Sequence, residues 1–517
     1  MERLLLNQAN LEKIGGRLKV PGYDRGSLPA RMVHVGLGHF HRAHQAAYID
    51  ALLNRGRLGA GIFAVNLVKD SYPLEEIARS QDYLYTLAAR GGDGGEELRV
   101  IGSILGYLNA SGDPEKAISL LASAETRVIS LTVTEKGYHF DMARGDLAWD
   151  SGPLQRDLRN PREPETMPAF LSAALEKRRR DRAGPVTVMS CDNFPSNGRI
   201  LKTAVLSFCK RAYPDLVPWI EENAAFPLSM VDRITPATSP SLLHYLQEKY
   251  GVEDRWAVGC EDFCQWVLED RLAAGAASGG GAEKPDGDFA ASLKALAEEG
   301  AGIVKDVEPY ELMKIRLLNG SHSALSYPAF LLGYTGVAEA LGDPLIRRFI
   351  RDRYMEEVSA TLPPVPGMDL DSYKDTLIKR FSNRNIGDTV LRLASDGSKK
   401  IPNSVLEPLA ELVRAGKARD SLIFALAAWA RFLSGSDERG RPIPLDDPNG
   451  GPLREAAKSA GENAEGFLKA ANMPELPEGE PGRLAERFGA YLDLIYRKGT
   501  RGALEEFLDG KAAEPVF

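Results

Sequence analysis

The feature that most constrains the fold is a strand, a glycine turn and a helix in immediate succession. Arg31–Val35 is an apolar run, Gly36 and Gly38 form a Gly-x-Gly turn, and a helical pattern continues to Leu53. In this order, glycines allow a tight turn and bring backbone N–H groups close to a pyrophosphate. His41 stands at the third glycine position of the usual fingerprint. The motif alone therefore only favours a dinucleotide-binding fold.

Alternating β-type and helical patterns extend this unit. The later candidate strands are Ile62–Val68, Leu98–Ile101, Arg127–Thr134 and Val186–Ser190. Such alternation is typical of a doubly wound α/β sheet. Asp70 follows the second strand, where an acidic residue would bind the adenosine ribose and favour NAD. Lys69 and Ser71 could instead tolerate a 2′-phosphate, so NADP stays possible.

The pattern changes after Ala273–Phe289, a Gly- and Ala-rich segment that we interpret as a surface loop or flexible insertion. Helical patterns then run over 291–300, 308–325, 337–361, 369–382, 404–416, 419–434 and 483–508. We predict an α/β fold in which a Rossmann-type domain (residues 1–288) precedes a mainly α-helical domain (residues 289–517).

Composition excludes several classes of protein. A chain of 517 residues exceeds one typical core, and its net charge of −8 argues against a nucleic-acid partner. The sequence contains no run of ~20 apolar residues, so we expect no membrane span. The N-terminal residues do not resemble a signal peptide. We expect a cytoplasmic monomer or small homo-oligomer that acts on a small molecule.

A metal site is not expected. The four cysteines are too few and too irregular for a disulfide framework, and Cys260-x-x-x-Cys264 has no partner pair for zinc. Three close histidines, His39, His41 and His44, lie in the cofactor turn and its helix. A metal there would collide with the pyrophosphate.

A second candidate site is the stretch Tyr310–Tyr327, YELMKIRLLNGSHSALSY. On an α-helix, Glu311, Lys314 and His322 fall within an arc of about 80°, with Asn319 about 60° further round. A buried lysine suits proton transfer without a metal, because burial lowers the pKa of an ammonium group towards neutrality. The alternative is an ordinary amphipathic helix with a Glu–Lys pair on its surface.

Two more polar clusters follow candidate strands. Asn193 lies in CDNFPSNG, directly after Val186–Ser190, and ligands of open α/β sheets bind at such carboxyl ends. Asp232 and Arg233 lie in MVDRITP. Taken alone, Asn193 could form only an Asx turn, and Asp232 with Arg233 only a structural ion pair.

Seven blocks fall between Leu4 and about Asp447: GLGHFHRAHQAAYID, SLTVTEKGY, VMSCDNFPSNG, MVDRITP, EDFCQWVLED, MKIRLLNGSHS and RFSN…ASDGSKKIP. Together they resemble the mannitol dehydrogenase family, which comprises polyol-specific long-chain dehydrogenases and related hexuronate reductases. The resemblance implies metal-independent hydride transfer between a nicotinamide and a sugar carbonyl or alcohol carbon.

The family motif Lys-x4-Asn-x2-His matches Lys314, Asn319 and His322. The resemblance implies that Lys314 is the general acid/base and that His322 orients the hydroxyl chain. It implies that Asn193 and Asn319 bind the reacting oxygen, and that Glu311 belongs to a proton path to solvent.

The resemblance also implies residues that contact the polyol and the cofactor. The polyol-contacting residues are Asp232, Arg392 and Lys400. The cofactor-binding residues are Gly36, Gly38, Phe40 and Asp70. Without the resemblance, Arg392 and Lys400 would be interpreted as cations of a solvated loop.

The substrate stays open between two branches of the family. Arg392, PVPGMDL and DSYKDTLIKRFSN resemble mannitol 2-dehydrogenases, whereas VNL, EKGY, WIEEN and IRLLNGSHS resemble fructuronate reductases. Lys136 could pair with a uronate carboxylate. We favour D-mannitol and D-fructose, with D-mannonate and D-fructuronate as the alternative. An inactive binding protein is a remote alternative, because Lys314, Asn319 and Asn193 are all present.

Overall fold

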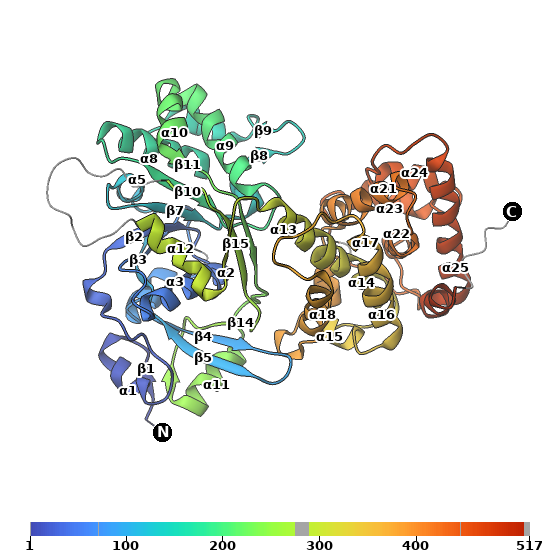
Figure 1. Cartoon of the computed structure of the whole chain (residues 1–517), viewed down its shortest axis with the longest axis horizontal. Coiled ribbons are helices and arrows are strands. Elements are labelled where there is room, and N and C mark those ends of the chain that lie inside the picture. The colour runs from blue at the N-terminus through green and yellow to red at the C-terminus, as the bar shows by residue number, and fades with distance from the viewer. Residues whose placement is uncertain (1, 71, 274–288, 445, 511–517) are drawn as a thin grey trace. The chain divides into compact units, whose positions relative to one another are not determined.

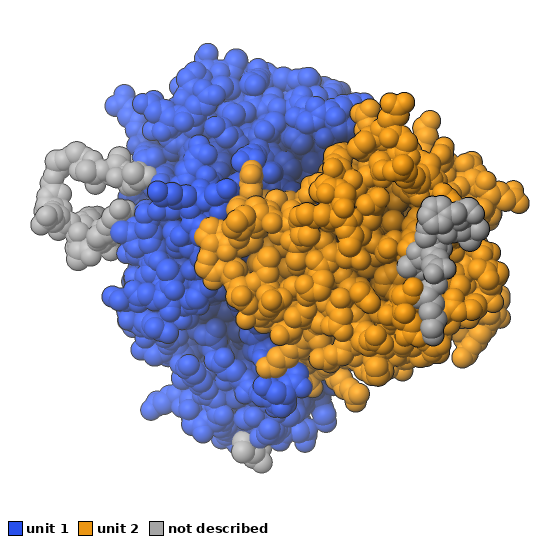
Figure 2. Space-filling model, turned by 45° about the vertical axis from the view of Figure 1, so that its right-hand side comes forward, with its two compact units in different colours: residues 1–307 blue, residues 308–517 orange. Residues whose placement is uncertain are grey.

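The structure is a computed structural model that describes residues 2–70, 72–273, 289–444 and 446–510. The chain divides into two compact units, Met1–Val307 (unit 1) and Glu308–Phe517 (unit 2), which Figures 1 and 2 show. Unit 1 contains a parallel sheet with helices, and unit 2 is mainly helical. The predicted fold class is therefore confirmed.

The central sheet of unit 1 has six parallel strands in the spatial order β6-β3-β2-β7-β10-β11. They are β2 (Ala30–Val35), β3 (Gly61–Asn66), β6 (Ile104–Asn109), β7 (Val128–Leu131), β10 (Val186–Ser190) and β11 (Ala224–Ala225). Numbered by their order in the chain, this is 3-2-1-4-5-6, the order of dinucleotide-binding sheets. The order reverses between β2 and β7, and ligands bind at the carboxyl ends there.

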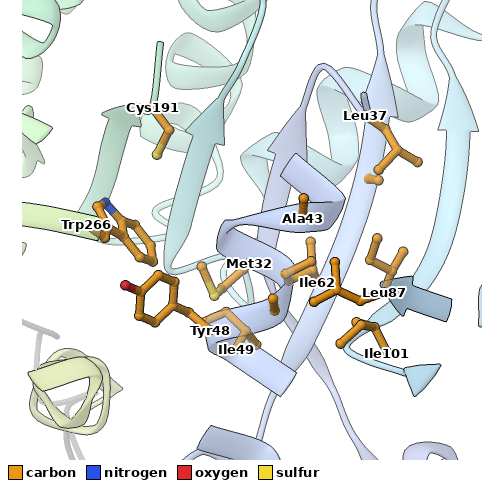
Figure 3. Packing of buried hydrophobic residues seen from close by; sticks show 14 of the residues in the cluster. Met32, Leu37, Ala43, Tyr48, Ile49, Ile62, Leu87, Ile101, Cys191 and Trp266 are labelled. Carbon is orange, nitrogen blue, oxygen red and sulfur yellow. The ribbon is translucent and has the colours of Figure 1, made fainter. Parts of the chain in front are cut away.

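Both faces of this sheet are apolar because helices cover both. Met32 of β2 packs with Ile49 and Ile62 in the cluster of Figure 3, whereas Val33 and Val35 belong to the cluster on the other face. Alternate strand residues point to opposite faces, so a strand covered twice is apolar throughout. Helices α2 (His39–Ala43) and α3 (Gln45–Asn54) contribute to the first cluster. The second includes residues of α5 (Pro114–Ala122), α8 (Met167–Arg180) and α9 (Asn197–Ala212).

The expectation that Leu98–Ile101 belongs to the parallel sheet is wrong. These residues lie in β5 (Glu96–Ile101), which pairs antiparallel with β4 (Tyr85–Arg90) in a separate sheet with β14 (Val258–Glu261). Only five residues, GGDGG, join β4 to β5. So short a link permits a hairpin but not the crossover that a parallel pair needs.

The remaining elements of unit 1 surround these sheets. The other strands are β1 (Leu4–Leu5), β8 (Phe140–Asp141), β9 (Asp146–Leu147), β12 (Ser229–Asp232), β13 (Val252–Glu253), β15 (Gln265–Glu269) and β16 (Gly302–Val304). The other helices are α1 (Leu11–Gly15), α4 (Leu74–Ser80), α6 (Thr134–Gly137), α7 (Gly152–Arg159), α10 (Val217–Asn223), α11 (Pro240–Tyr250) and α12 (Phe289–Lys294).

The boundary between the units lies at 307/308, whereas the sequence predicted a boundary at 288/289. The intervening residues stay with unit 1 because Leu293 and Leu296 pack in the same cluster as Trp266. Strand β16 also pairs with β15. The predicted surface loop falls largely on residues 274–288, which lie outside the described part of the chain.

Unit 2 is organised around α22 (Asp420–Leu433), whose residues from Ser421 to Leu433 are all buried. It packs against α14 (Gly320–Leu331) and α25 (Glu480–Leu508), as Figure 1 shows. The other helices are α13 (Glu308–Met313), α15 (Val337–Ala340), α16 (Pro344–Arg348), α17 (Met355–Ser359), α18 (Leu370–Phe381), α19 (Val390–Ala394), α20 (Gly397–Ile401), α21 (Glu407–Arg414), α23 (Gly450–Lys458) and α24 (Ala464–Ala470). No described helix is both long enough and apolar enough to cross a membrane.

Three of the predicted helices contain a π-helical segment, in which the N–H group bonds a carbonyl five residues earlier instead of four. These segments are η5 (Lys314–Asn319), η6 (Phe349–Tyr354) and η8 (Pro402–Leu406). The predicted helix over 337–361 is also broken into α15, α16, η6 and α17. Apolar spacing marks which face is buried, so it did not reveal these changes of pitch.

The four cysteines all belong to unit 1. Cys191, Cys209 and Cys260 are buried thiols, and Cys264 is half-buried. Burial raises the pKa of Cys209 and of Cys260 to about 12. It raises the pKa of Cys191 and Cys264 as well.

Candidate functional site

The glycine turn lies where the strand order of unit 1 reverses. Gly36 has φ +99°, and a Cβ there would lie 2.2 Å from the carbonyl oxygen of Thr132, so only glycine fits. Gly38 has nothing closer to a Cβ position than the Gly36 oxygen at 4.0 Å. The Leu37 N–H donates to Asn66 Oδ1 at 2.7 Å. The first glycine shapes the turn, and the second leaves space beside it that a pyrophosphate could occupy.

The buried imidazole of His34 contacts the backbone of this turn. His34 Nε2 lies 2.9 Å from Thr132 Oγ1 and 3.2 Å from the Gly36 carbonyl oxygen, and its Nδ1 lies 2.9 Å from Ser130 Oγ. Burial lowers the pKa of His34 to about 3, so the ring is neutral at pH 7. The ring of His41 stacks on it at 3.4 Å between centroids, and burial also lowers the pKa of His41.

The helix predicted to run to Leu53 is interrupted at His44, which separates α2 from α3 with φ −117° and ψ −89°. His44 Nε2 lies 2.8 Å from the Gln265 carbonyl oxygen, and Phe40 stacks on its ring at 5.0 Å. His41 and His44 thus pack against neighbouring rings, and His44 also contacts the backbone of β15. Among the described residues, no three His, Cys, Asp or Glu side chains are placed to hold a metal ion.

Asp70 lies four residues after β3, and its carboxylate is held in place. Tyr107 donates its hydroxyl to Asp70 Oδ2 at 2.6 Å, and Asn66 donates its amide to Oδ1 at 2.7 Å. Burial and the hydrogen bond to Asp70 raise the pKa of Tyr107, so the tyrosine remains a donor. A cavity of about 550 Å³ opens beside Asp70, and its other charged lining residues are Glu75, Glu76 and Arg79. Arg79 pairs with Glu75, so the lining carries a net negative charge.

Asn193 is exposed in the loop at the carboxyl end of β10. Its neighbour Asp192 is buried and accepts hydrogen bonds from the N–H groups of Val133 and Thr134, at 3.1 and 2.9 Å. Tyr138 donates its hydroxyl to the same carboxylate at 2.7 Å. Asp192 therefore fixes the loop of Asn193 to the loop after β7. Sequence reasoning considered only the asparagine of this turn.

Asp232 ends β12 and is buried. The adjacent Arg233 donates to the carbonyl oxygens of Ala43 at 2.7 Å and Glu261 at 3.0 Å. Arg233 thus joins the end of α2 to β14 and has a structural role. Of the pair, Asp232 stays the substrate-binding candidate.

In unit 2, Lys314 and Glu311 are buried, and Asn319 and His322 are half-buried. In an uninterrupted α-helix, Asn319 and His322 would lie about 140° and 80° round the axis from Lys314. The Gly320 N–H instead donates to the Ile315 carbonyl, five residues earlier. The additional residue in this turn rotates the positions of all later residues about the helix axis by about 100°. Asn319 and His322 therefore both come within about 40° of Lys314. The π turn gathers the three side chains more closely than the sequence indicated.

The rest of this helix is firmly anchored. Arg316, about 200° round from Lys314, donates to both carboxylate oxygens of Glu411 at 2.8 and 2.7 Å and to the Thr361 carbonyl at 2.6 Å. The ring of His322 lies 4.4 Å from that of Phe381 in α18. Sequence reasoning missed Arg316, which nothing in the local pattern distinguishes from a surface cation.

The two predicted polyol-contacting cations differ in environment. Lys400 Nζ donates to the carbonyl oxygen of Ser395 at 2.8 Å, and burial lowers the pKa of Lys400. The Arg392 side chain is 61% exposed and pairs with Asp388, with Nε 2.6 Å from Oδ1. Lys400 is thus a partly desolvated amine, whereas Arg392 is a cation already paired near the surface.

Comparisons with known proteins add to this geometry. The chain matches the mannitol dehydrogenase Rossmann domain over residues 30–278 and the mannitol dehydrogenase C-terminal domain over residues 306–481. It is 40% identical to a mannitol 2-dehydrogenase of Phaeosphaeria nodorum, over 86% of this chain and 76% of that protein. It is 38% identical to one of Aspergillus terreus, over 98% of this chain and 100% of that protein.

Two solved structures are similar over nearly the whole chain. One is Pseudomonas fluorescens mannitol 2-dehydrogenase in a ternary complex with NAD and D-mannitol, with TM-score 0.83, 36% identity and coverage of 98% of this chain and 100% of that one. The other is a D-sorbitol dehydrogenase in substrate-free form, with TM-score 0.83, 32% identity and coverage of 97% and 100%.

Proposed function

Because the chain belongs to the mannitol dehydrogenase family and is an NAD-dependent polyol dehydrogenase, we propose that it interconverts D-mannitol and D-fructose. The reaction is hydride transfer at C2. The observation that carries this proposal is the buried Lys314 at the start of a π-helical turn that contains Asn319 and directly precedes the α14 segment of His322. The full-length similarity to an enzyme bound to NAD and D-mannitol supports the choice of substrate.

Lys314 is the general acid/base of the proposed reaction. In reduction its ammonium group donates a proton to the ketone oxygen at C2, and in oxidation its amine accepts the hydroxyl proton. The amides of Asn193 and Asn319 donate hydrogen bonds to that oxygen as negative charge develops, and such donors contribute ~3–4 kcal/mol each. Glu311, one helical turn before Lys314, relays the proton towards solvent. Bound NADH supplies the hydride, and NAD accepts it in the reverse direction.

The remaining side chains bind and orient the sugar. His322 orients its hydroxyl chain, and Asp232, Arg392 and Lys400 contact its other hydroxyl groups. We assign no metal to this reaction, because protonated Lys314 supplies both the positive charge and the proton at the reacting oxygen.

The turn of Gly36 and Gly38 fits a dinucleotide, because a Cβ at Gly38 would fill the space left for the pyrophosphate. Asp70 would accept hydrogen bonds from the adenosine ribose, and Phe40 would contact the cofactor from α2. The cavity beside Asp70 is lined by three carboxylates and one arginine, and its net negative charge favours NAD over NADP.

One observation favours the second candidate, a fructuronate reductase. Lys136 is exposed on α6, five residues after the carboxyl end of β7. An exposed cation at that edge of the sheet is suited to a uronate carboxylate.

The deciding experiment measures NADH and NADPH oxidation with D-fructose and with D-fructuronate, side by side and with a chelator present. Fast turnover of fructose with NADH supports the proposal, and fast turnover of only fructuronate replaces it with the second candidate. In the latter case Lys136→Ala should raise KM for fructuronate. Turnover of neither sugar, nor of a wider panel of polyols, with NADH still bound, would favour a binding protein.

A further inference from the structure

The three π-helical segments of unit 2 meet at one buried point. Tyr354, the last residue of η6, donates its hydroxyl to the carbonyl oxygen of Ser404 in η8 at 3.1 Å. Gly320 directly follows η5, and a Cβ there would lie 2.5 Å from the Tyr354 hydroxyl and 2.9 Å from the Ser404 oxygen. Tyr354 is 0% and Ser404 1% exposed, so water does not reach this contact.

Pro408 removes the α-helical partner of the Ser404 carbonyl, which would be the N–H group four residues later. Ser404 lies instead in the π-helical segment η8. The Tyr354 hydroxyl donates a hydrogen bond to this carbonyl from a different helical segment, η6.

The joined segments carry residues of the proposed reaction. Segment η5 carries Lys314 and Asn319 immediately before Gly320. Lys400 lies four residues before Ser404, whose hydroxyl donates to the Lys400 carbonyl oxygen at 2.7 Å. The hydroxyl of Tyr354 therefore touches the two backbones that carry the acid/base lysine and a candidate polyol-binding lysine.

We propose that Tyr354 is a positioning residue for the polyol dehydrogenase reaction: its hydroxyl holds the segment of Lys314 and Asn319 against the segment of Lys400. This inference rests on the proposed function. Tyr354 does not contact the reacting atoms and acts through the two backbones. A displacement of about 1 Å at a reacting group can lower turnover by ~100-fold, so a small change at this contact is enough to affect the rate.

The test begins with Tyr354→Phe, which removes the hydroxyl and keeps the ring. We expect kcat for fructose reduction to fall at least tenfold. KM for NADH should stay the same, because the candidate cofactor residues lie in unit 1. The matched control is Tyr327→Phe, since the buried Tyr327 hydroxyl makes no hydrogen bond within the described structure. An equal loss of kcat in both variants would overturn the inference.

A second pair of variants tests the contact with Gly320. Gly320→Ala places a methyl group against the Tyr354 hydroxyl and should lower kcat further than Tyr354→Phe does. In the double variant Gly320→Ala/Tyr354→Phe the closest clash is gone. The fold decrease in its kcat should therefore be smaller than the product of the fold decreases in the two single variants. If the fold decrease in kcat of the double variant equalled the product of the two single decreases, the inference would be overturned.

Hydrogen–deuterium exchange without substrate separates this inference from the proposed function. Tyr354→Phe should speed amide exchange in residues 314–320 and 402–406, and Tyr327→Phe should not. Faster exchange with unchanged kcat would make Tyr354 a packing residue and overturn its positioning role. If the native enzyme turned over no polyol, the proposed function would fail. The exchange data would then decide whether Tyr354 holds the two segments together. Unchanged exchange in Tyr354→Phe would overturn that role, and faster exchange in both segments would support it.

Discussion

Lys314, the proposed general acid/base, combines two features that suit an amine to this role. It is 5% exposed, so its charge is poorly hydrated, and it shares one side of its helix with an amide and an imidazole. Burial of an amine favours its neutral form, which is the form that accepts a proton when an alcohol is oxidised.

Lys314→Ala should lower kcat for fructose reduction by ~100- to 10,000-fold, the usual contribution of a general acid. NADH affinity should change little, because the glycine turn lies in the other unit. Steady-state kinetics and a fluorescence titration of NADH measure the two effects. Lys399→Ala, at an exposed lysine of the same unit, is the control. If Lys314→Ala kept more than a tenth of the activity, Lys314 would not be the acid/base.

Asp70→Ala should shift the coenzyme preference from NADH towards NADPH. The substitution removes both the acceptor for the ribose hydroxyls and a negative charge that would repel a 2′-phosphate. The ratio of kcat/KM for the two coenzymes is the measurement. Tyr107→Phe, which removes one donor to Asp70 but keeps its charge, should retain the preference for NADH. An unchanged ratio in Asp70→Ala would mean that another group selects the coenzyme.

At the scale of elements, the two glycines of the turn between β2 and α2 have different roles. Gly36 has positive φ, and its missing Cβ avoids the carbonyl of Thr132. Gly38 has φ −118°, which any residue can adopt, and the space beside it is open. The first glycine is therefore required by the fold, whereas the fold does not require the second, which we propose leaves space for the cofactor.

Gly36→Ala should destabilise the protein by at least about 2–3 kcal/mol, because of backbone strain and the clash with Thr132. Gly38→Ala should leave stability within about 0.5 kcal/mol of the native value. It should nevertheless weaken NADH binding at least tenfold. Urea unfolding and NADH titration of the two variants measure these effects. Normal NADH affinity in Gly38→Ala would place the pyrophosphate elsewhere.

Local sequence signals predicted the strand–turn–helix unit, because its glycines and its apolar run are contiguous. They did not place Leu98–Ile101 in its sheet, since a four-residue apolar run does not indicate its partner strand. The π turn at Lys314 was equally hidden, because it changes pitch without changing which residues are apolar. Tyr354 and Asp192 act through distant backbone groups, and only the folded chain brings these together.

At the scale of the whole molecule, the buried histidines of unit 1 link stability to pH. The folded chain holds His34 neutral, with its pKa near 3, whereas an unfolded histidine has a pKa near ~6.5. Below pH 6.5 the unfolded chain binds a proton that the folded chain does not. Stability is therefore complete above that pH and is lost as the pH falls towards 3.

From pH 7 to pH 5, His34 alone should lower the free energy of unfolding by about 2 kcal/mol. His41, whose pKa is also lowered, adds to this loss. Urea unfolding at several pH values measures the slope, and His34→Asn should make it shallower. The exposed His244 provides the control substitution. A slope identical in His34→Asn and the native chain would show that His34 is charged in the folded protein.

The buried thiols have a practical consequence for conjugation. The thiolate form of cysteine is the nucleophile that attacks a maleimide reagent, and burial keeps the pKa of all four native cysteines above its usual value. Unit 2 has no cysteine at all. A single cysteine introduced on an exposed face of α25 should therefore react first at neutral pH. The native chain is already a suitable background for attaching a dye, a spin label or an electrode linker at one chosen position.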